Sequence, residues 1–192
     1  MEIVTVGYED NPVFLDSFLH CMQEVDAFVE ISELASRRGM TLREYGGPVW
    51  AACHHSGEVR GIFDARRRLI AFTLYMRLCT IERDEPGAYA ALFEPPFPPE
   101  LLVKMRELGD DMLYLLGIGV YPEYRRQGIA KRMIADITAR YGRYGIMADV
   151  SGDISLQIYR DYGFIIQRLP SPYPYYFVFR KPPGGLSNEG II

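Results

Sequence analysis

The sequence predicts a single α/β domain of the α+β type, built on a mixed β-sheet with flanking helices. Two runs, at 69–78 and 111–120, are apolar on both faces, as strands in the middle of a sheet are. Strand-like runs also lie near both ends of the chain, at 2–8 and 175–180. Helical and strand-like segments alternate between the second apolar run and the last strand, which indicates a mixed α/β sheet.

The segment after the first strand has the signals of a helix. Asp10 or Asn11 can act as the N-cap, and Pro12 then takes the first helical position. Apolar residues recur at helical spacing from Phe14 onward, and Gly39 is expected to be the C-cap after two arginines. The pattern leaves open whether this region forms one bent helix or two.

The middle of the chain combines short strands with a long insertion. Strands are expected at 48–55 and 58–64, and Arg66, Arg67 and Arg68 should form an exposed hairpin tip before the first apolar run. Residues 82–110 are rich in proline, and connections of this length in compact domains are often functional or mobile. A single domain is therefore expected over 1–180, with this insertion inside it.

An amphipathic helix is predicted over 128–142, after the second apolar run. Its apolar face consists of Ile129, Met133, Ile134, Ile137 and Tyr141, and its charged face of Lys131, Arg132, Asp136 and Arg140. A strand at 145–151, a short helix from Asp153 and strands at 164–169 and 175–180 complete the fold. Residues 181–192 are expected to be a flexible tail.

Charge and cysteine content argue against several classes of protein. The formal net charge of −4 disfavours a nucleic-acid partner, so any anion site has to be local. Three widely spaced cysteines without a CxxC pair disfavour a disulfide framework or a structural zinc site. Cys53, His54 and His55 are contiguous and cannot readily close on one metal ion.

No targeting or membrane signal is visible in the sequence. The first residues lack the basic and apolar regions of a signal peptide. No apolar run approaches the roughly 20 residues that a membrane-spanning helix needs. We therefore expect a cytoplasmic protein without a membrane contact and without a metal site.

The junction "VYPEYRRQGIAKRM", residues 120–133, joins the second apolar strand to the amphipathic helix. The first amides of a helix have no partner within it, and the helix dipole adds partial positive charge there. Gly128 lets an anion approach the main chain without a side chain in the way, and Ala130 keeps the next turn open. The junction alone allows either a phosphate site or an ordinary solvated turn.

Two motifs in a fixed order make the phosphate site more specific. Arg125, Gly128 and Ala130 fill the pattern of arginine or glutamine, two residues, glycine, one residue, then glycine or alanine. The preceding "V-x-P" is formed by Val120 and Pro122, and the downstream "LQIYRDYGF" contains Tyr159, Gly163 and Phe164. Over about 58–180, with the insertion excepted, the chain resembles the GCN5-related N-acetyltransferase (GNAT) superfamily.

The resemblance implies a mostly antiparallel sheet whose fourth and fifth strands splay apart around acetyl-CoA (coenzyme A). It implies that the main chain of Ile118, Gly119 and Val120 pairs with the pantetheine arm. The pyrophosphate is then expected beside Arg125 and on the amides of Arg126, Gln127, Gly128, Ile129 and Ala130. Tyr159 takes the position of the superfamily's general acid, which protonates the departing sulfur; the alternative for it is a core tyrosine.

The chain also departs from the superfamily's pattern. Members often have an asparagine seven residues before the tyrosine, where this sequence has Gly152. No carboxylate lies within "LYLLGIG" on the expected fourth strand, and Glu107, Asp110 and Asp111 precede it as solvated charges. The general base is therefore not assigned. The main-chain amide of Val120 is the expected donor to the acyl carbonyl.

The expected function is transfer of an acetyl group from acetyl-CoA to a primary amine, of a small molecule rather than a protein. The proline-rich insertion and the rings of Tyr173–Phe177 could enclose a small acceptor, although that aromatic run can equally just begin the last strand. Two alternatives stay open, a protein N-terminal or lysine acetyltransferase and a non-catalytic acyl-CoA-binding or regulatory module. The amine acceptor is the expected partner, and the choice between monomer and homodimer stays open.

Overall fold

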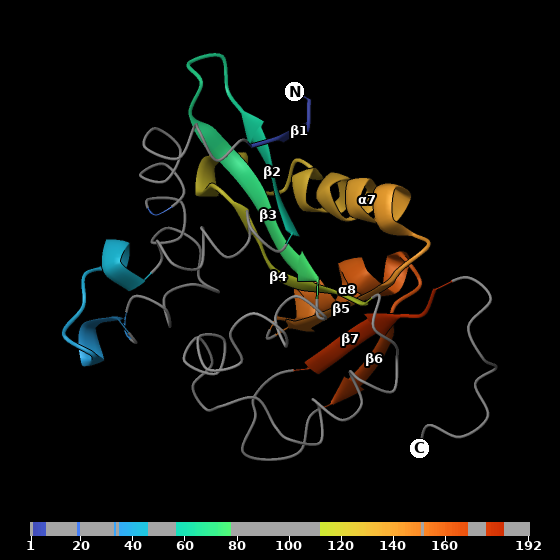
Figure 1. The fold of residues 1–192 in the computed structure, drawn as a ribbon. Coiled ribbons are helices and arrows are strands. Elements are labelled where there is room, and N and C mark those ends of the chain that lie inside the picture. Colours follow the sequence, from blue (N-terminus) through green and yellow to red (C-terminus); the bar gives the residue numbers. More distant parts are fainter. Residues whose placement is uncertain are drawn as a thin grey trace.

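The computed structural model describes residues 2–6, 19, 33, 35–45, 57–77, 112–150, 152–168 and 176–182. At its centre is a seven-stranded mixed sheet in the order β1-β2-β3-β4-β5-β7-β6 (Figure 1). The strands are β1 (Val4–Thr5), β2 (Gly57–Phe63), β3 (Leu69–Arg77), β4 (Met112–Val120), β5 (Gly145–Val150), β6 (Ile165–Arg168) and β7 (Tyr176–Arg180). Between them lie the 3-10 turn η3 (Pro122–Tyr124) and the helices α7 (Ile129–Tyr141) and α8 (Asp153–Asp161).

The neighbouring strands β4 and β5 are parallel, and they separate early. They pair at Met112↔Gly145, Leu113↔Ile146 and Tyr114↔Met147. Beyond these pairs, β4 continues beside β3 to Val120, whereas β5 continues beside β7 to Val150. The other neighbouring pairs of described strands are antiparallel. The mostly antiparallel sheet with splayed fourth and fifth strands is therefore confirmed.

The last part of β4 departs from regular pairing with β3. Leu74 pairs with Gly117 and Tyr75 with Leu115, so Leu116 is an extra residue that forms a β-bulge on β4. Gly119 has a different reason to be glycine, because a Cβ there would lie 2.3 Å from the Phe72 ring of β3. The glycines near the end of the strand thus mark a bulge and a close approach by a neighbouring side chain.

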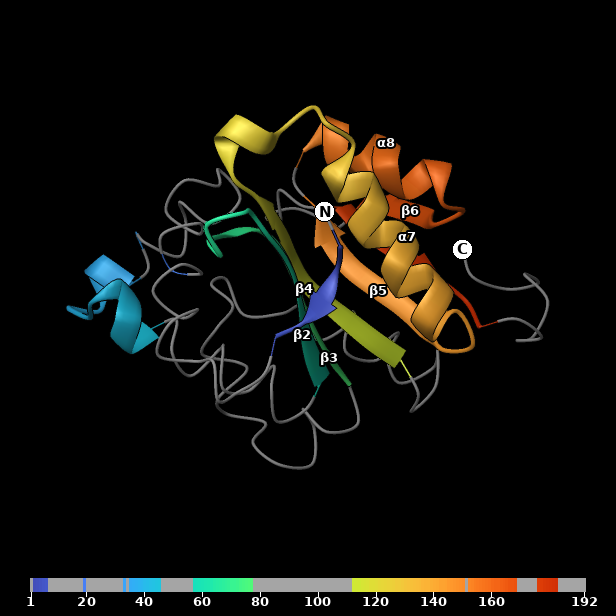
Figure 2. The same ribbon diagram turned by 90° about the horizontal axis from the view of Figure 1, so that it is seen from above.

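The helices α7 and α8 lie next to each other on one face of the sheet (Figure 2). A buried cluster packs them against β3, β4, β5 and β7, and it contains Ile134, Ile137, Leu156 and Tyr159. A second cluster joins Ile129 and Met133 of α7 to side chains of β2 and β3. The Lys131 ammonium and the Asp161 carboxylate, 2.7 Å apart, link the two helices at the surface.

The described elements agree closely with the sequence prediction. Each strand predicted from 58–64 onward within the described ranges appears within about two residues of its expected bounds, and so do both helices. Of the first predicted strand, the structure describes residues 2–6, and within them Val4–Thr5 pair with β2. Gly39 has a φ of 67°, and the Met40 amide donates to the Ala35 carbonyl at 2.9 Å, so the predicted C-cap is confirmed.

Several predicted features lie outside the described residues. They are the helix start at 10–12, the strand at 48–55, the insertion at 82–110 and the aromatic residues before Tyr176. The tail from 183 onward lies outside them too, and residues 181–182 have no regular secondary structure.

One charged residue of α7 does not face solvent as the helical pattern predicts. Asp136 belongs to the predicted charged face, yet it makes two hydrogen bonds with Arg60 of β2. Tyr141 packs beside the core as expected, but its hydroxyl donates to Glu58 of β2. Helical periodicity cannot reveal these contacts, because the partners lie on a strand distant in sequence.

The turn between β2 and β3 is the exposed hairpin tip predicted for Arg66, Arg67 and Arg68. Arg68 Nε donates to Asp64 across this turn at 2.7 Å. Within the described ranges, no helix has the length and apolar character that crossing a bilayer requires. The described histidine, cysteine, aspartate and glutamate side chains also form no group of three that could hold a metal ion.

Candidate active site

A short loop carries the chain from β4 into α7, and hydrogen bonds fix its course. The Tyr121 amide donates to the Ile70 carbonyl of β3 at 2.8 Å, and the Tyr124 amide to the Tyr121 carbonyl at 2.9 Å. The Arg125 side chain turns back, and its Nε donates to the Val120 carbonyl at 3.2 Å. These hydrogen bonds fix the position of the start of α7 relative to the end of β4.

The start of α7 presents main-chain amides that the helix leaves unpaired. Gly128 is the N-cap residue, and no side chain caps the helix there. The first helical bond runs from the Arg132 amide to the Gly128 carbonyl at 3.1 Å. The amides of Ile129, Ala130 and Lys131 therefore have no acceptor within the helix, and together with the helix dipole they favour an anion.

The backbone before α7 also suits an anion. Arg126 has a φ of 61° and Gly128 a φ of 74°. A non-glycine residue with positive φ is uncommon and occurs disproportionately at functional sites, and left-handed residues can turn neighbouring amides toward one concave side. A Cβ at position 128 would meet no atom within 4 Å, so the space in front of this residue is open. We call residues 126–130 the cradle.

The end of β4 adds main-chain groups that face away from β3. In an antiparallel ladder, hydrogen-bonded and non-hydrogen-bonded pairs alternate. Because the Tyr121 amide bonds to Ile70, the next hydrogen-bonded pair along β4 is Gly119–Phe72. The N–H and C=O groups of Ile118 and Val120 consequently point the other way, toward the opening between β4 and β5. The bond from Arg125 Nε to the Val120 carbonyl agrees with this direction.

Tyr159 of α8 lies on the helix side of the same opening. Its side chain is only 6% exposed and packs edge-on against Phe164, with ring centroids 5.0 Å apart. Ile118 of β4 packs against the buried cluster that contains Tyr159. Among the described residues, the Tyr159 hydroxyl has no hydrogen-bond partner. Burial raises the pKa of this hydroxyl and the charge of Asp149 raises it further, so it stays protonated at neutral pH.

Sequence reasoning missed a carboxylate in this region, that of Asp149 on β5. Its neighbours Ala148 and Val150 belong to the helix-side cluster, so Asp149 faces the opposite side of the sheet. Tyr114 of β4 faces the same side, and its hydroxyl donates to Asp149. The available signal was an isolated acid in the apolar run "GIMADV", whereas the candidates for a base were taken from the fourth strand and from acids outside the fifth strand.

The expected site residues lie in four parts of the chain. Ile118, Gly119 and Val120 end β4; Arg125, Arg126 and Gln127 form the loop; Gly128, Ile129 and Ala130 begin α7; and Tyr159 lies in α8. Gln127 Nε2 donates to the Glu123 carbonyl at 3.2 Å, and the Ile129 side chain is buried in the core. Their expected contribution to an anion site is therefore through main-chain amides. Glu107, Asp110 and Asp111 lie outside the described residues.

Position 152, where the superfamily often has asparagine, is the N-cap of α8. Gly152 has extended backbone angles and supplies no side-chain cap. A Cβ there would meet only the Ser155 hydroxyl, at 3.9 Å. The glycine is thus not required by crowding among the described residues.

These elements match a known family of enzymes. The model of the acetyltransferase (GNAT) family matches residues 64–164, more than half of the chain. The chain belongs to this family. It is accordingly an acyltransferase that uses an acyl-CoA donor. No curated protein matches the chain in sequence.

Solved structures share the fold at low sequence identity. A histone acetyltransferase HPA2-related acetyltransferase from Corynebacterium glutamicum has a TM-score of 0.61 at 15% identity, over 94% of this chain and 95% of that one. An N-acetyltransferase from Staphylococcus aureus has a TM-score of 0.57 at 14% identity, over 93% and 98%. The ribosomal-protein-S18-alanine N-acetyltransferase of Escherichia coli has a TM-score of 0.53 at 14% identity, over 100% and 99%. These similarities establish the fold and leave the acceptor undetermined.

Proposed function

We propose that this GNAT acyltransferase transfers an acetyl group from acetyl-CoA to the primary amine of a small molecule. The observation that carries the proposal is the open cradle at Gly128, which lies directly after the strand that separates from β5. A thioester donor whose pyrophosphate rests on these amides can extend along β4 toward Tyr159. The residues present fit such a donor, because the cradle is positive through its main chain and free of side-chain obstruction.

The cofactor is bound mainly by main-chain groups in this proposal. The amides of the cradle take the pyrophosphate oxygens, and the guanidinium group of Arg126 adds positive potential. The main-chain groups of Ile118 and Val120 face the opening and can pair with the amide groups of the pantetheine arm. Specificity for coenzyme A then depends on loop conformation more than on side-chain chemistry.

The chemistry needs an activated acyl group, a donor for its carbonyl oxygen and a proton source. Bound acetyl-CoA supplies the acetyl group as a thioester. The Val120 N–H is aimed into the opening, where it can donate to the carbonyl oxygen. The Tyr159 hydroxyl holds its proton because burial, and then the charge of Asp149, raise its pKa, so it can donate to the departing sulfur.

Asp149 is the proposed contact for the acceptor amine. Its carboxylate lies on the sheet face opposite α7 and α8, and the Tyr114 hydroxyl orients it. Its direct cross-strand neighbour is Phe177 of β7, and the Phe177 and Phe179 rings stack with centroids 5.5 Å apart. A carboxylate beside aromatic rings suits an organic ammonium group, which supports a small amine as acceptor.

The proposal is tested by measuring thiol release from acetyl-CoA in the presence of amines of different classes. The panel contains polyamines, amino acids, aminoglycosides, arylalkylamines and peptides with free N-termini. Release with one class of small amine is the expected result, and release with peptides alone would make the chain a protein acetyltransferase. Tight coenzyme A binding with no release across the panel would identify a non-catalytic acyl-CoA-binding module.

A further inference from the structure

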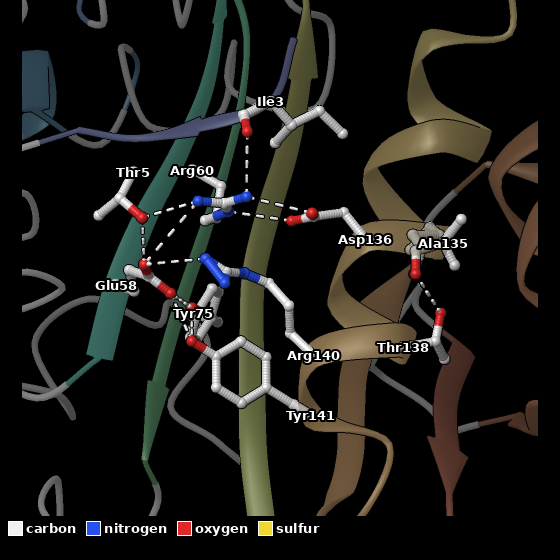
Figure 3. Close-up of polar contacts among 11 residues, drawn as sticks. Ile3, Thr5, Glu58, Arg60, Tyr75, Ala135, Asp136, Thr138, Arg140 and Tyr141 are labelled. Carbon is white, nitrogen blue, oxygen red and sulfur yellow. Dashed lines mark hydrogen bonds and ion pairs between the residues drawn. The ribbon is translucent and has the colours of Figure 1, made fainter.

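A buried ion pair joins β2 to the middle of α7, away from the cradle. Arg60 is 5% exposed, and its Nε and Nη2 donate to the two carboxylate oxygens of Asp136 at 2.9 and 3.1 Å (Figure 3). Two parallel hydrogen bonds of this kind fix both distance and orientation. Residues 60 and 136 are far apart in sequence, so the pair constrains the placement of a whole helix on the sheet.

The same guanidinium also holds the edge strand β1. Arg60 Nη1 donates to the Thr5 hydroxyl at 2.7 Å, and Nη2 donates to the Ile3 carbonyl at 3.1 Å. Within the described residues, β1 pairs with β2 at two positions, Val4↔Gly61 and Thr5↔Arg60. A side chain that bonds Thr5 of so short a strand and the preceding residue Ile3 contributes substantially to its docking.

A second polar contact fixes the last turn of α7. Glu58 of β2 accepts hydrogen bonds from the hydroxyls of Thr5, Tyr75 and Tyr141. Arg140 Nη2 lies 4.0 Å from the same carboxylate (Figure 3). Thr5, Glu58, Arg60, Asp136 and Tyr141 thus form one network between β1, β2 and α7, and we call it the α7 anchor.

Apolar packing alone does not fix the position of α7 along its own axis. In the cluster that joins the first turns of α7 to β2 and β3, the buried side chains are aliphatic apart from the adaptable Met133. Gly128 lies about 12 Å from Asp136 along the axis, at about 1.5 Å per residue. A continuous helix transmits a shift at Asp136 to the amides at Gly128, and a displacement of about 1 Å there misplaces ligand contacts.

We propose that Arg60 is a positioning residue for cofactor binding. Its bonds to Asp136 determine the position of α7 along the helix axis, and therefore the position of the cradle. Its bonds to Thr5 and Ile3 link that position to the docking of β1. The inference rests on the proposed function, since it takes the cradle as the coenzyme A site. Cofactor binding and β1 docking are then coupled, so each should strengthen the other.

The test uses a variant that removes the pair without leaving a buried charge. In Arg60→Met/Asp136→Asn both charges are lost together, which proteins tolerate better than the loss of one partner. Coenzyme A binding is measured by calorimetry at 25 °C without an acceptor. We expect Kd to rise at least fivefold. With an active acceptor, KM for acetyl-CoA rises while kcat and the acceptor KM keep their wild-type values.

Two further variants separate positioning from general loss of stability. Val59→Ala removes buried methyl groups from the opposite face of β2, and it should lower the unfolding temperature without changing Kd. Arg60→Lys keeps the charge, but a single ammonium cannot reproduce the guanidinium's bonds to Asp136, Thr5 and Ile3, so Kd rises here too. If the double variant does not fold, Arg60→Lys alone tests whether Arg60 positions the cradle.

A second readout follows the edge strand directly. The Val6 amide donates to the Val59 carbonyl at 2.9 Å, and its hydrogen exchange should slow when coenzyme A binds the wild-type protein. A folded Arg60 variant with wild-type Kd, or no change in Val6 exchange on binding, overturns the inference. Absence of coenzyme A binding by the wild-type protein would instead overturn the proposed function.

Discussion

Replacing Gly128 by alanine tests the cradle with the smallest available change. The glycine has a φ of 74°, and a Cβ at this position points into open space, within 4 Å of no other atom. The fold therefore accepts the methyl group sterically. The same methyl group occupies the space in which pyrophosphate oxygens are proposed to approach the amides.

Two costs can be worked out separately for Gly128→Ala. A non-glycine residue in the left-handed region costs about 1–2 kcal/mol of stability, or about 2–8 °C in unfolding temperature for a chain of this size. Blocking one charge-assisted hydrogen bond to phosphate costs about 1.5–3 kcal/mol of binding, which is a loss of about 10- to 150-fold in affinity. The variant should therefore fold and bind coenzyme A poorly.

Gly39→Ala is the matched control for Gly128→Ala. Gly39 has a φ of 67°, and a Cβ there also meets no atom within 4 Å, but it lies after a helix of the N-terminal part of the chain. Both variants should lose similar stability in thermal unfolding, while calorimetric titration with coenzyme A shows a loss for Gly128→Ala alone. Equal coenzyme A affinity in the two variants would refute the cradle as the pyrophosphate site.

Substitutions at four further positions test other parts of the site and the core. Tyr159→Phe should lower kcat about 100-fold or more with an unchanged Kd for coenzyme A, and single-turnover kinetics with wild-type rates would contradict its role as proton donor. Asp149→Asn should raise the acceptor KM about tenfold and leave the acetyl-CoA KM unchanged, as steady-state kinetics can show. Arg125→Gln should bind coenzyme A normally, whereas Arg125→Met should not, in the same titration. Thr73→Val should raise the unfolding temperature by about 2–4 °C, because the buried Thr73 hydroxyl has no partner among the described residues and costs about 1 kcal/mol; a decrease would contradict this.

The sequence predicted the parts of the structure that depend on local pattern. The strand at 69–78 and the cap at Gly39 both follow from residue type and short-range periodicity. The separation of β4 from β5 was predicted by the family resemblance, since nothing in the two apolar runs indicates where their pairing stops. Tyr159 was likewise found through its motif.

Contacts between elements distant in sequence could not be predicted in the same way. Helical periodicity assigns Asp136 to the charged face of α7 and says nothing about Arg60, which lies on a strand 76 residues earlier. Asp149 was overlooked because its importance comes from Tyr114 and Tyr159 on two other elements. A single polar residue within an apolar strand is the signal that such a site leaves in the sequence.

The position of Arg125 explains why the family motif accepts either arginine or glutamine there. Arg125 Nε donates to the Val120 carbonyl, and it is joined to its Cα by the same number of bonds as the Nε2 of a glutamine would be. Either side chain can therefore supply a planar N–H to the end of β4. In the proposed function, the residue acts chiefly as a brace that sets the loop, and the pyrophosphate is bound by the amides from Arg126 onward. An acidic protein, with a net charge of −4, can hold a highly charged cofactor in this way without a large basic surface.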